Sequence, residues 1–422
     1  MKNKLDTYSL ALSVGYFLAV RDIRRASIWT TLLITFVMML TFLNLVVVRG
    51  ILVGLTEGSV RSYRERYTGD VLLGTLDKKQ YIEDSHLPRE IAEQLPQVRA
   101  VSARYVVPGT IEADYKTVVR RDEGADKANA VMVGIDPGRE DALTNLSRQV
   151  VSGRYLTSDD HDAVLVGVSL LTKYQSAAGT GTASLKTADV GTQIRLTVNG
   201  IVKEVTIVGV VKAKVTNVDS RVFMLDRELR LLMGRDDFNV NEIAIRANGK
   251  SSEKEIAAIL LGNGIDAQAK VQTWQEAQPQ FIRDISATFA LLGDLIGSIG
   301  LAVASITIFI VIFVNAITRR KFIGILKGIG VNSLAIQCSY VFQSIFYALS
   351  GSLLGLVVVY GLMVPYFADN PINFPFSDGI FVADVPGVLL RVVVLFFATI
   401  AAGYIPARIV VKQNTLDAIL GR

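Results

Sequence analysis

The chain contains very little cysteine and histidine, and this scarcity excludes several classes of function. Among 422 residues there is one cysteine, Cys338, and there are two histidines, His86 and His161. A single cysteine cannot form a disulfide framework, a zinc cluster or a redox pair, and two histidines offer few ligands to a metal or a haem. We therefore expect no cofactor and no metal on this chain.

Charge is missing from long stretches of the sequence. Residues 28–48, 295–317 and 328–368 contain no Asp, Glu, Lys or Arg, and residues 385–405 contain only Arg391. Each stretch reaches the ~20 residues that a membrane-spanning helix needs, and Arg391 lies close enough to one end to snorkel to the interface. The sequence predicts four transmembrane helices, with a large soluble domain of mixed polarity between the first and the second.

Basic residues gather on one side of the predicted spans. Residues 1–27, the turn at 319–327 and the tail after 407 together hold twelve Lys or Arg and three Asp or Glu, whereas the loop 366–384 holds three Asp and no basic residue. Because cytoplasmic loops are rich in Lys and Arg, we expect both termini in the cytoplasm and the large domain outside. This placement accounts for the basic residues without nucleic acid, and the first span, which lacks a cleavage site, is predicted to stay as an anchor.

These expectations divide the chain into nine segments. They are a cytoplasmic-face amphipathic helix (1–27), transmembrane helix 1 (28–55), an extracytoplasmic α+β domain (56–284), transmembrane helix 2 (285–318), a cytoplasmic turn or helix (319–332), transmembrane helix 3 (333–365), an external loop (366–384), transmembrane helix 4 (385–406) and a cytoplasmic tail (407–422). The first segment has apolar residues at helical spacing and ends in three arginines, which is typical of a helix on the inner leaflet; it could also be a simple flank of the first span.

The soluble domain mixes strand and helix patterns. Its hydrophobic spacing predicts a helix at 90–95 and strands at 98–107, 130–135 and 163–167. Asn199-Gly200 lies between two β-rich runs and predicts a two-residue hairpin. The mixture indicates an α+β domain, either single or split into two lobes.

Two further features complete the local predictions for this domain. A strand at 242–245 precedes a helix that starts near Ser251 as its N-cap. Residues 176–189 are rich in Ser, Thr, Ala and Gly, which favours a mobile loop.

Two segments of the soluble domain imitate chemical motifs without completing them. Residues 244–251 read AIRANGKS, which lacks the first glycine of a phosphate-binding loop, so we interpret them as a polar turn. Residues 157–162 read TSDDHD, but neighbours in an extended loop do not converge on one ion. The spans are poor in ionisable residues, with Asp294 and Arg391 near their outer ends, which disfavours an ion relay. An enzyme with its own active site is not expected.

Glycine pairs occur in two of the spans. Gly293 and Gly297 in the second span, and Gly351 and Gly355 in the third, have the GxxxG spacing that lets helix backbones approach closely inside lipid. We predict that these four glycines pack against other helices.

The turn between the second and third spans carries a family resemblance. Residues 318–331 read TRRKFIGILKGIGV, which resembles the signature of MacB/FtsX-type permeases of ABC transporters. Phe322 stands where that family usually has glutamate, and Gly328 where alanine is common. Weaker matches follow in order along the chain: residues 153–156, 164–168, 190–191, 208–210 and the C-terminal residues 406–422.

The resemblance implies a non-catalytic permease subunit of the bacterial inner membrane. In that family two cytosolic ATPase subunits bind ATP and Mg, a second permease copy or a paralogue completes the complex, and a periplasmic domain with porter and sabre lobes moves when the ATPases close, which is called mechanotransmission. The turn would be the coupling helix that docks on the ATPase, formed by Arg319, Arg320, Lys321, Phe322, Ile323, Gly324, Ile325, Leu326, Lys327 and Gly330. The same basic residues could also simply anchor the span to lipid headgroups.

Three functions remain open at the sequence level. The first is a permease that acts on a lipoprotein, a lipid or an exported peptide or drug, with the lipoprotein-releasing branch of the family favoured. The second is an FtsX-like regulator whose external domain activates a cell-wall hydrolase. The third is a membrane-anchored binding protein that has no ATPase partner.

Overall fold

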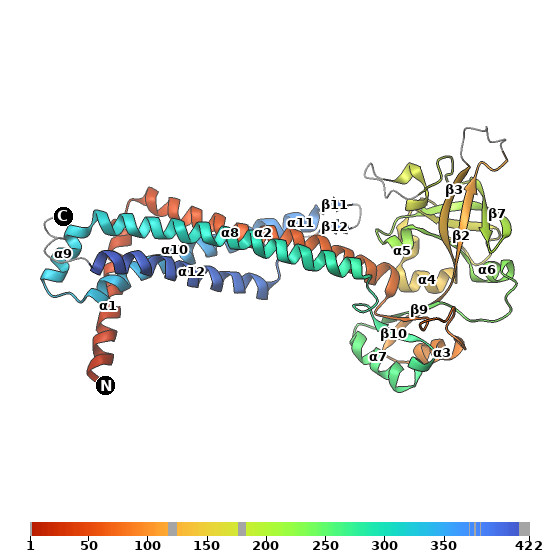
Figure 1. The fold of residues 1–422 in the computed structure, drawn as a ribbon, viewed down its shortest axis with the longest axis horizontal. Helices are drawn as coiled ribbons and strands as arrows, with labels where there is room; N and C mark the ends of the chain where they lie inside the picture. Colours follow the sequence, from red (N-terminus) through yellow and green to blue (C-terminus); the bar gives the residue numbers. More distant parts are fainter. Residues whose placement is uncertain are drawn as a thin grey trace. The chain divides into compact units, whose positions relative to one another are not determined.

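A computed structural model describes residues 2–116, 125–175, 183–370, 372–374, 377–379 and 381–412 (Figure 1). The chain divides into two compact units. The membrane unit comprises residues 1–57, 284–372 and 379–422, and the soluble unit comprises residues 58–283 and 373–378. Each unit is described by itself below.

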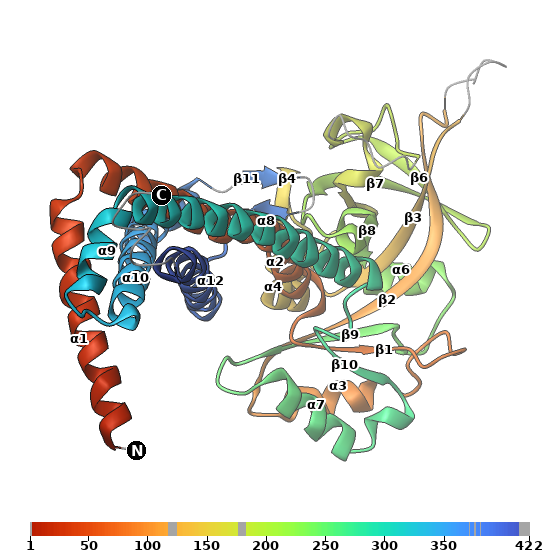
Figure 2. The same cartoon turned by 60° about the vertical axis from the view of Figure 1, so that its left-hand side comes forward.

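The membrane unit is a bundle of long apolar helices (Figures 1 and 2). Among the described residues, four helical stretches are long and apolar enough to cross a membrane, which agrees with the number of spans predicted from the charge-free stretches. Their helices are α2 (Ile28–Tyr63), α8 (Gln280–Thr318), α10 (Ser333–Val358), continued by the π-helical turn η6 (Val359–Met363) and α11 (Val364–Asp369), and α12 (Val385–Lys412).

The helix ends differ from several segment boundaries expected from the sequence. Helix α2 continues past residue 55 to Tyr63, and α12 continues past residue 406 to Lys412. The loop 366–384 begins within α11 and contains the two short strands β11 (Ile372–Phe374) and β12 (Ser377–Gly379). Hydropathy marks where a helix can lie in lipid, but the helical hydrogen bonds continue into water, so apolar length underestimates helix length.

Helix α2 lies against both predicted glycine pairs. A Cβ atom added to Gly293 would come within 3.2 Å of Arg49, and one added to Gly297 within 3.4 Å of Leu45. On α10, a Cβ added to Gly351 would lie 2.5 Å from Met38 Cβ, and one added to Gly355 would clash with the Phe42 ring. The two GxxxG pairs therefore bring α8 and α10 against α2 within one chain.

Helix α1 (Lys2–Arg25) is separate from α2 and packs against α10. Ala11, Leu18 and Ala19 are buried, and Gly15 lies so close to α10 that a Cβ there would come within 2.7 Å of Cys338 Cβ. Its other face exposes Leu10, Tyr16 and Phe17. One face of the helix is thus used for packing within the chain, another exposes large apolar side chains, and its place on the inner leaflet stays a prediction.

The soluble unit is built on a ten-stranded sheet. The strand order is β10-β1-β9-β2-β3-β8-β5-β7-β4, and β6 pairs with β2 and β7. The strands are β1 (Val71–Gly74), β2 (Val98–Ala113), β3 (Asp126–Ile135), β4 (Val150–Gly153), β5 (Ala163–Gly167), β6 (Gln193–Val198), β7 (Ile201–Val211), β8 (Arg221–Leu225), β9 (Glu242–Ala247) and β10 (Lys270–Thr273). Short helices cover it: α3 (His86–Gln94), α4 (Pro137–Thr144), α5 (Thr216–Asp219), α6 (Asp226–Leu232) and α7 (Glu253–Gly262).

One long strand joins two lobes of this unit. The first half of β2 pairs with β9, and its second half, from Tyr105 onward, pairs with β3. The smaller lobe has a core of its own around Val71, Ile243 and Leu260, and the larger lobe has one around Ile111, Met132 and Ile207. Of the two arrangements left open by the sequence, the domain adopts the one with two lobes.

The predicted hairpin is present between β6 and β7. Asn199 and Gly200 have φ values of 47° and 81°, so both turn residues adopt the left-handed conformation that a two-residue hairpin requires. The predicted N-cap at Ser251 is wrong by one residue, because Ser252 accepts the hydrogen bond from the Glu255 amide at 3.2 Å. Serine caps a helix through the amide three residues ahead, and only Ser252 has that spacing here.

The prediction of a mobile loop at 176–189 can be compared with the structure only at residues 183–189, because residues 176–182 lie outside the described part of the chain. For residues 183–189 the prediction is wrong. Leu185 is fully buried, and its backbone exchanges hydrogen bonds with Leu170 and Thr172. Composition alone gave no weight to this single leucine, whose burial holds the segment against the larger lobe.

The contact between α2 and α10 predicts the effect of one methyl group. Gly351→Ala would place a Cβ 2.5 Å from Met38 Cβ and 3.0 Å from its backbone carbonyl carbon, so we expect a loss of about 1–3 kcal/mol of unfolding free energy. Gly361→Ala is the matched control, because nothing lies within 4 Å of its added Cβ. Thermal unfolding of the full chain in detergent would show a lower Tm for Gly351→Ala only; equal values would contradict the packing.

Candidate functional site

Helix α9 (Arg320–Gly328) forms the turn that the sequence singled out. Ile323 and Gly324 are buried, whereas Phe322 and Ile325 are 41% and 52% exposed. Leu326 packs at the edge of the membrane core, and Gly330 reverses the chain before α10 with a φ of 94°. The helix therefore has one apolar face turned inward and presents two large apolar side chains outward.

The basic residues of this turn are partly engaged within the chain. Arg319 Nη1 lies 2.9 Å from Asp22 Oδ1 on α1, and the Arg21 guanidinium lies 5.3 Å from the centre of the Phe322 ring. Lys327 Nζ donates a hydrogen bond of 3.0 Å to the carbonyl oxygen of Val411 on α12. Lys321 is exposed, and Arg320 is half-buried. Sequence reasoning missed Asp22 as a partner, because a residue 297 positions before Arg319 gives no local signal.

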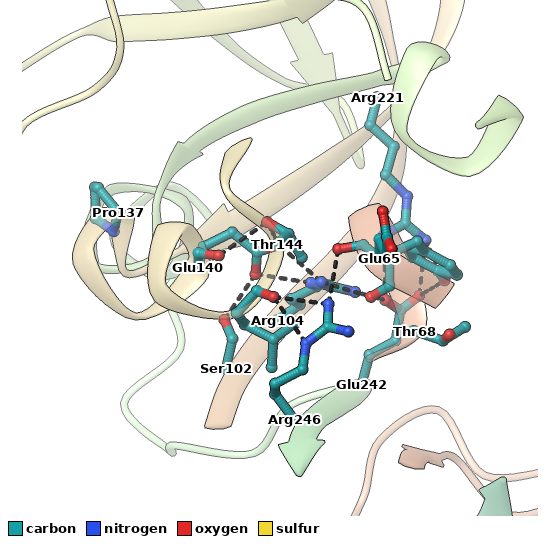
Figure 3. Close-up of polar contacts among 12 residues, drawn as sticks. Glu65, Thr68, Ser102, Arg104, Pro137, Glu140, Thr144, Arg221, Glu242 and Arg246 are labelled. Carbon is teal, nitrogen blue, oxygen red and sulfur yellow. Dashed lines mark hydrogen bonds and ion pairs between the residues drawn. The ribbon is translucent and has the colours of Figure 1, made fainter. Parts of the chain in front are cut away.

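A second candidate site surrounds the π-helical turn η1 (Arg64–Thr68), which follows α2 in the soluble unit. It brings Tyr67 against Arg104 on β2, Arg221 on β8 and Glu242 on β9, and Arg104 in turn pairs with Glu140 on α4. We call these five residues the anchor cluster; Figure 3 labels its four charged members. Arg104 and Glu140 are 1% and 2% exposed, and the other three are also largely removed from solvent.

The ion pairs of the anchor cluster are closely matched. Arg104 Nη2 lies 2.7 Å and its Nε 2.9 Å from the two oxygens of Glu140. Arg221 Nη2 lies 2.7 Å from Glu242 Oε1, which also accepts a hydrogen bond of 2.8 Å from the Tyr67 hydroxyl. The Arg104 and Arg221 guanidinium carbons lie 5.0 and 4.8 Å from the Tyr67 ring centre. Because each buried charge has a hydrogen-bonded partner, the cost of removing these groups from water is offset.

The charged state of the cluster follows from these contacts. Burial opposes ionisation of Glu242, but Arg221 and Arg104 outweigh it and lower the pKa of Glu242 to about 2. Burial likewise opposes protonation of Arg104, but Glu140 outweighs it and raises the Arg104 pKa. Glu242 is therefore ionised and Arg104 protonated throughout the physiological pH range.

Arginines also hold the backbone of η1 directly. Arg104 Nη2 donates to the Tyr67 carbonyl oxygen at 2.8 Å, and Arg246 Nη2 donates to the Glu65 carbonyl oxygen at 2.8 Å. From η1 itself, Arg66 Nη1 donates to the Ala213 carbonyl oxygen of the larger lobe at 2.7 Å. The carbonyls at a helix end lack hydrogen-bond donors within the helix, and here two arginine side chains of the sheet donate to two of these carbonyls. The turn η1 is thus bonded to both lobes.

Asp219 lies beside the contact between Arg66 and Ala213. Its Oδ1 accepts a hydrogen bond of 2.6 Å from the Ala213 amide, and the side chain is almost completely buried. Burial raises the pKa of Asp219 to about 6, although backbone hydrogen bonds and Arg66 oppose this. This carboxyl group changes its charge close to neutral pH.

The acidic segment 157–162 does not converge on one point. Asp160 accepts two hydrogen bonds from Arg154, at 2.6 and 2.7 Å, and one from the Thr157 amide, while His161 faces Glu228. Within the described residues no group of three or more His, Cys, Asp or Glu side chains is arranged to hold a metal ion. The segment acts as a structural turn.

Comparison with known proteins gives one family match. Residues 295–415 match the model of the FtsX-like permease C-terminal family, which confirms the resemblance to MacB/FtsX-type permeases; the lipoprotein-releasing branch stays a prediction. No curated protein matches the chain.

Two solved structures are similar to about half of the chain. One is the extracellular domain of the noncanonic ABC-type transporter YknZ from Gram-positive bacteria, with 16% identity, 49% of this chain and 100% of that chain covered, and a TM-score of 0.32. The other is the periplasmic region of MacB from Actinobacillus actinomycetemcomitans, with 13% identity, 50% of this chain and 92% of that chain covered, and a TM-score of 0.32.

The anchor cluster predicts a large cost for removing one buried cation. Arg104→Leu would leave Glu140 buried without its guanidinium partner, so we expect a loss of about 3–5 kcal/mol of unfolding free energy. Arg139→Leu removes an arginine that is 42% exposed and paired with Glu93, where about 0–1 kcal/mol is expected. Chemical unfolding of both full-length variants, followed by circular dichroism, checks this; similar losses would show that the cluster is not a special source of stability.

The raised pKa of Asp219 predicts how stability depends on pH. The folded-state pKa of Asp219, about 6, exceeds its unfolded value. The contribution of this carboxyl group to the free energy of unfolding is therefore fully present below pH ~4 and is lost as pH rises through 6. The free energy of unfolding of the Asp219→Asn variant, relative to that of the native chain, should therefore rise by about 2–3 kcal/mol from pH 4 to pH 7. Unfolding of both proteins at the two pH values measures the difference, and a pH-independent difference would rule out this titration.

Proposed function

We propose that this chain, whose residues 295–415 match the FtsX-like permease C-terminal family, is the non-catalytic transmembrane subunit of an ABC transporter. Two separate cytosolic ATPase subunits bind ATP and Mg and dock on α9. The observation that carries this proposal is the outward placement of Phe322 and Ile325 on a short helix between two spans. Large apolar side chains in the centre of a contact, with charged residues around them, are typical of protein interfaces.

The proposed route from α9 to the soluble unit follows continuous helices. Helix α8 leads from the soluble unit to α9 without interruption over 39 residues, and α2 runs over 36 residues into η1. The anchor cluster and the bonds to the η1 carbonyls tie that last turn to both lobes. ATP-driven movement of the bundle would therefore reach the lobes through α2, which is the physical content of mechanotransmission here.

Charge supports the proposed orientation. The termini and α9 carry most of the basic flanking residues, so they lie in the cytoplasm of a bacterial inner membrane, and the soluble unit lies outside. There it acts on a lipoprotein, a lipid or an exported peptide or drug. The alternative function is an FtsX-like regulator of a cell-wall hydrolase, because such a regulator would use the same helix α9 and the same anchor cluster.

The first experiment identifies what binds the chain. The gently solubilised, affinity-purified protein is analysed by mass spectrometry for copurifying polypeptides and lipids, and ATP hydrolysis is assayed on the same sample. A stoichiometric ATPase supports the transporter subunit, and a lipoprotein, a lipid or a hydrolase in the sample chooses among its branches. Absence of any ATPase and of hydrolysis would favour the anchored binding protein.

The exposed face of α9 predicts a specific loss of coupling. Phe322→Asp with Ile325→Asp would place two charges in the proposed contact, and we expect at least a tenfold loss of copurifying ATPase and of its stimulation. Leu231→Asp is the matched control, because Leu231 is 81% exposed on α6 in the soluble unit. Equal ATPase recovery in all samples would remove α9 as the docking site.

A further inference from the structure

A cavity of about 650 Å³ lies within the soluble unit and is lined from both of its lobes. The first turn of α3 and the residues just before it come from the smaller lobe, whereas α4 and α6 follow strands β3 and β8 of the larger lobe. Residues 237–240, which lead from α6 toward β9, also line it. The volume falls in the ~300–1,000 Å³ range of small-molecule sites.

The buried part of this lining is apolar and lies where two parallel strands end. Strands β3 and β8 run parallel, and Ile135 opposite Leu225 is their last pair. Both side chains are buried and line the cavity, together with the buried Val240. In α/β sheets, ligands commonly bind beyond the carboxyl ends of parallel strands. The cavity therefore has an apolar base in a position that suits a ligand.

Phe238 adds a large aromatic ring to the lining. The ring is 80% exposed, although the loop that carries it is held from both lobes. Arg230 Nη1 on α6 donates to the Asp237 carbonyl oxygen at 2.7 Å, and the Val240 amide donates to Ser85 Oγ at 2.9 Å. A held loop that presents an aromatic ring to water gives up the burial of that ring. Such a ring is available to cover the apolar part of a ligand.

Three guanidinium groups of the lining have donors to spare. Arg89 and Arg139 both pair with Glu93, which is a single carboxylate. Arg227 is exposed, and its side chain makes one hydrogen bond within the described residues, of 3.4 Å to the Asp160 carbonyl oxygen. Because each guanidinium has five N–H donors in a planar fork, these arginines fit a further carboxylate.

Four aspartates line the same cavity. Three of them are paired within the chain, Asp136 with Arg139, Asp226 with Arg230 and Asp237 with Arg235. Asp84 is exposed, and its carboxylate has no hydrogen bond or ion pair with any residue that the structure describes. The cavity thus offers unused cationic donors and one unused anionic acceptor beside an apolar base. This combination fits a zwitterion better than a simple anion.

We propose that this cavity binds the end of a peptide chain. The terminal carboxylate lies at Arg139 and Arg227, an apolar side chain packs against Phe238 and the apolar base, and a peptide N–H or ammonium group donates to Asp84. A simple anion or a fatty acid would meet Asp84 as a like charge, whereas a peptide supplies both donors and acceptors. Because both lobes line the cavity, a bound peptide contacts both of them.

This site is separate from the surface of α9, and it does not depend on what the proposed transporter moves. Peptide binding is measured on this chain alone. A missing ATPase partner would therefore leave the inference intact, and a failure to bind peptide would leave the proposed docking of the ATPase intact.

The site is tested by isothermal titration calorimetry of the full chain in lipid nanodiscs. The probe is the tripeptide alanyl-alanyl-phenylalanine, and we expect saturable binding of one peptide per chain. The same tripeptide with a C-terminal amide lacks the carboxylate, so it should bind at least about tenfold more weakly. Absence of saturable binding of the free acid, or equal affinity for the acid and the amide, would overturn the proposal.

Variants of two exposed side chains locate the binding. Arg227→Ala and Phe238→Ala should each weaken binding of the free acid about tenfold, and Arg227→Ala should also reduce the preference for the acid over the amide, which a purely structural loss would not do. The matched controls are Arg148→Ala and Leu231→Ala, which change exposed residues outside the lining; Leu231 is 81% exposed. Thermal unfolding checks that all four variants fold. Equal affinity of all four would remove the peptide from this cavity.

Discussion

The buried ion pairs around η1 are the constraint on which the soluble unit depends. Arg104 and Arg221 come from two strands, Glu140 and Glu242 from a helix and a third strand, and Tyr67 from η1. None of these charges is tolerable in the interior without its partner. The two lobes and η1 must therefore assemble together, and the position of η1 in the soluble unit is fixed by electrostatics as well as by packing.

The membrane unit follows a different principle around the same helix. Inside lipid there is no hydrophobic gain from bringing helices together, so close approach and polar contacts decide which faces meet. Glycines on α8 and α10 allow α2 to lie between them, and Arg49 pairs with Asp294 near one end. Helix α2 is thus the common element of both units, and the proposed function uses it as the connection between ATPase-driven and substrate-facing parts.

Local rules recovered much of the architecture. The spans followed from runs without charge, the hairpin from Asn199-Gly200, and the α+β class from alternating strand and helix patterns. Errors arose where two neighbouring residues compete, as with Ser251 and Ser252, or where one buried side chain orders a polar segment, as Leu185 does. The sequence signal for the anchor cluster was weak: Arg104 and Glu242 are isolated charges within strand patterns, and nothing local tells which distant charge each will meet.

The amino-acid sequence by itself indicated four candidate spans, a large domain between the first two, and a basic turn with a family-like pattern between the second and third, because these properties depend on composition and spacing along the chain. The tertiary structure alone decided that α2 lies against both glycine pairs, that Asp22 pairs with Arg319, and that four distant charges pair with one another beside Tyr67. Such contacts join residues far apart in sequence, and the energy of a buried charge depends on its neighbours in space.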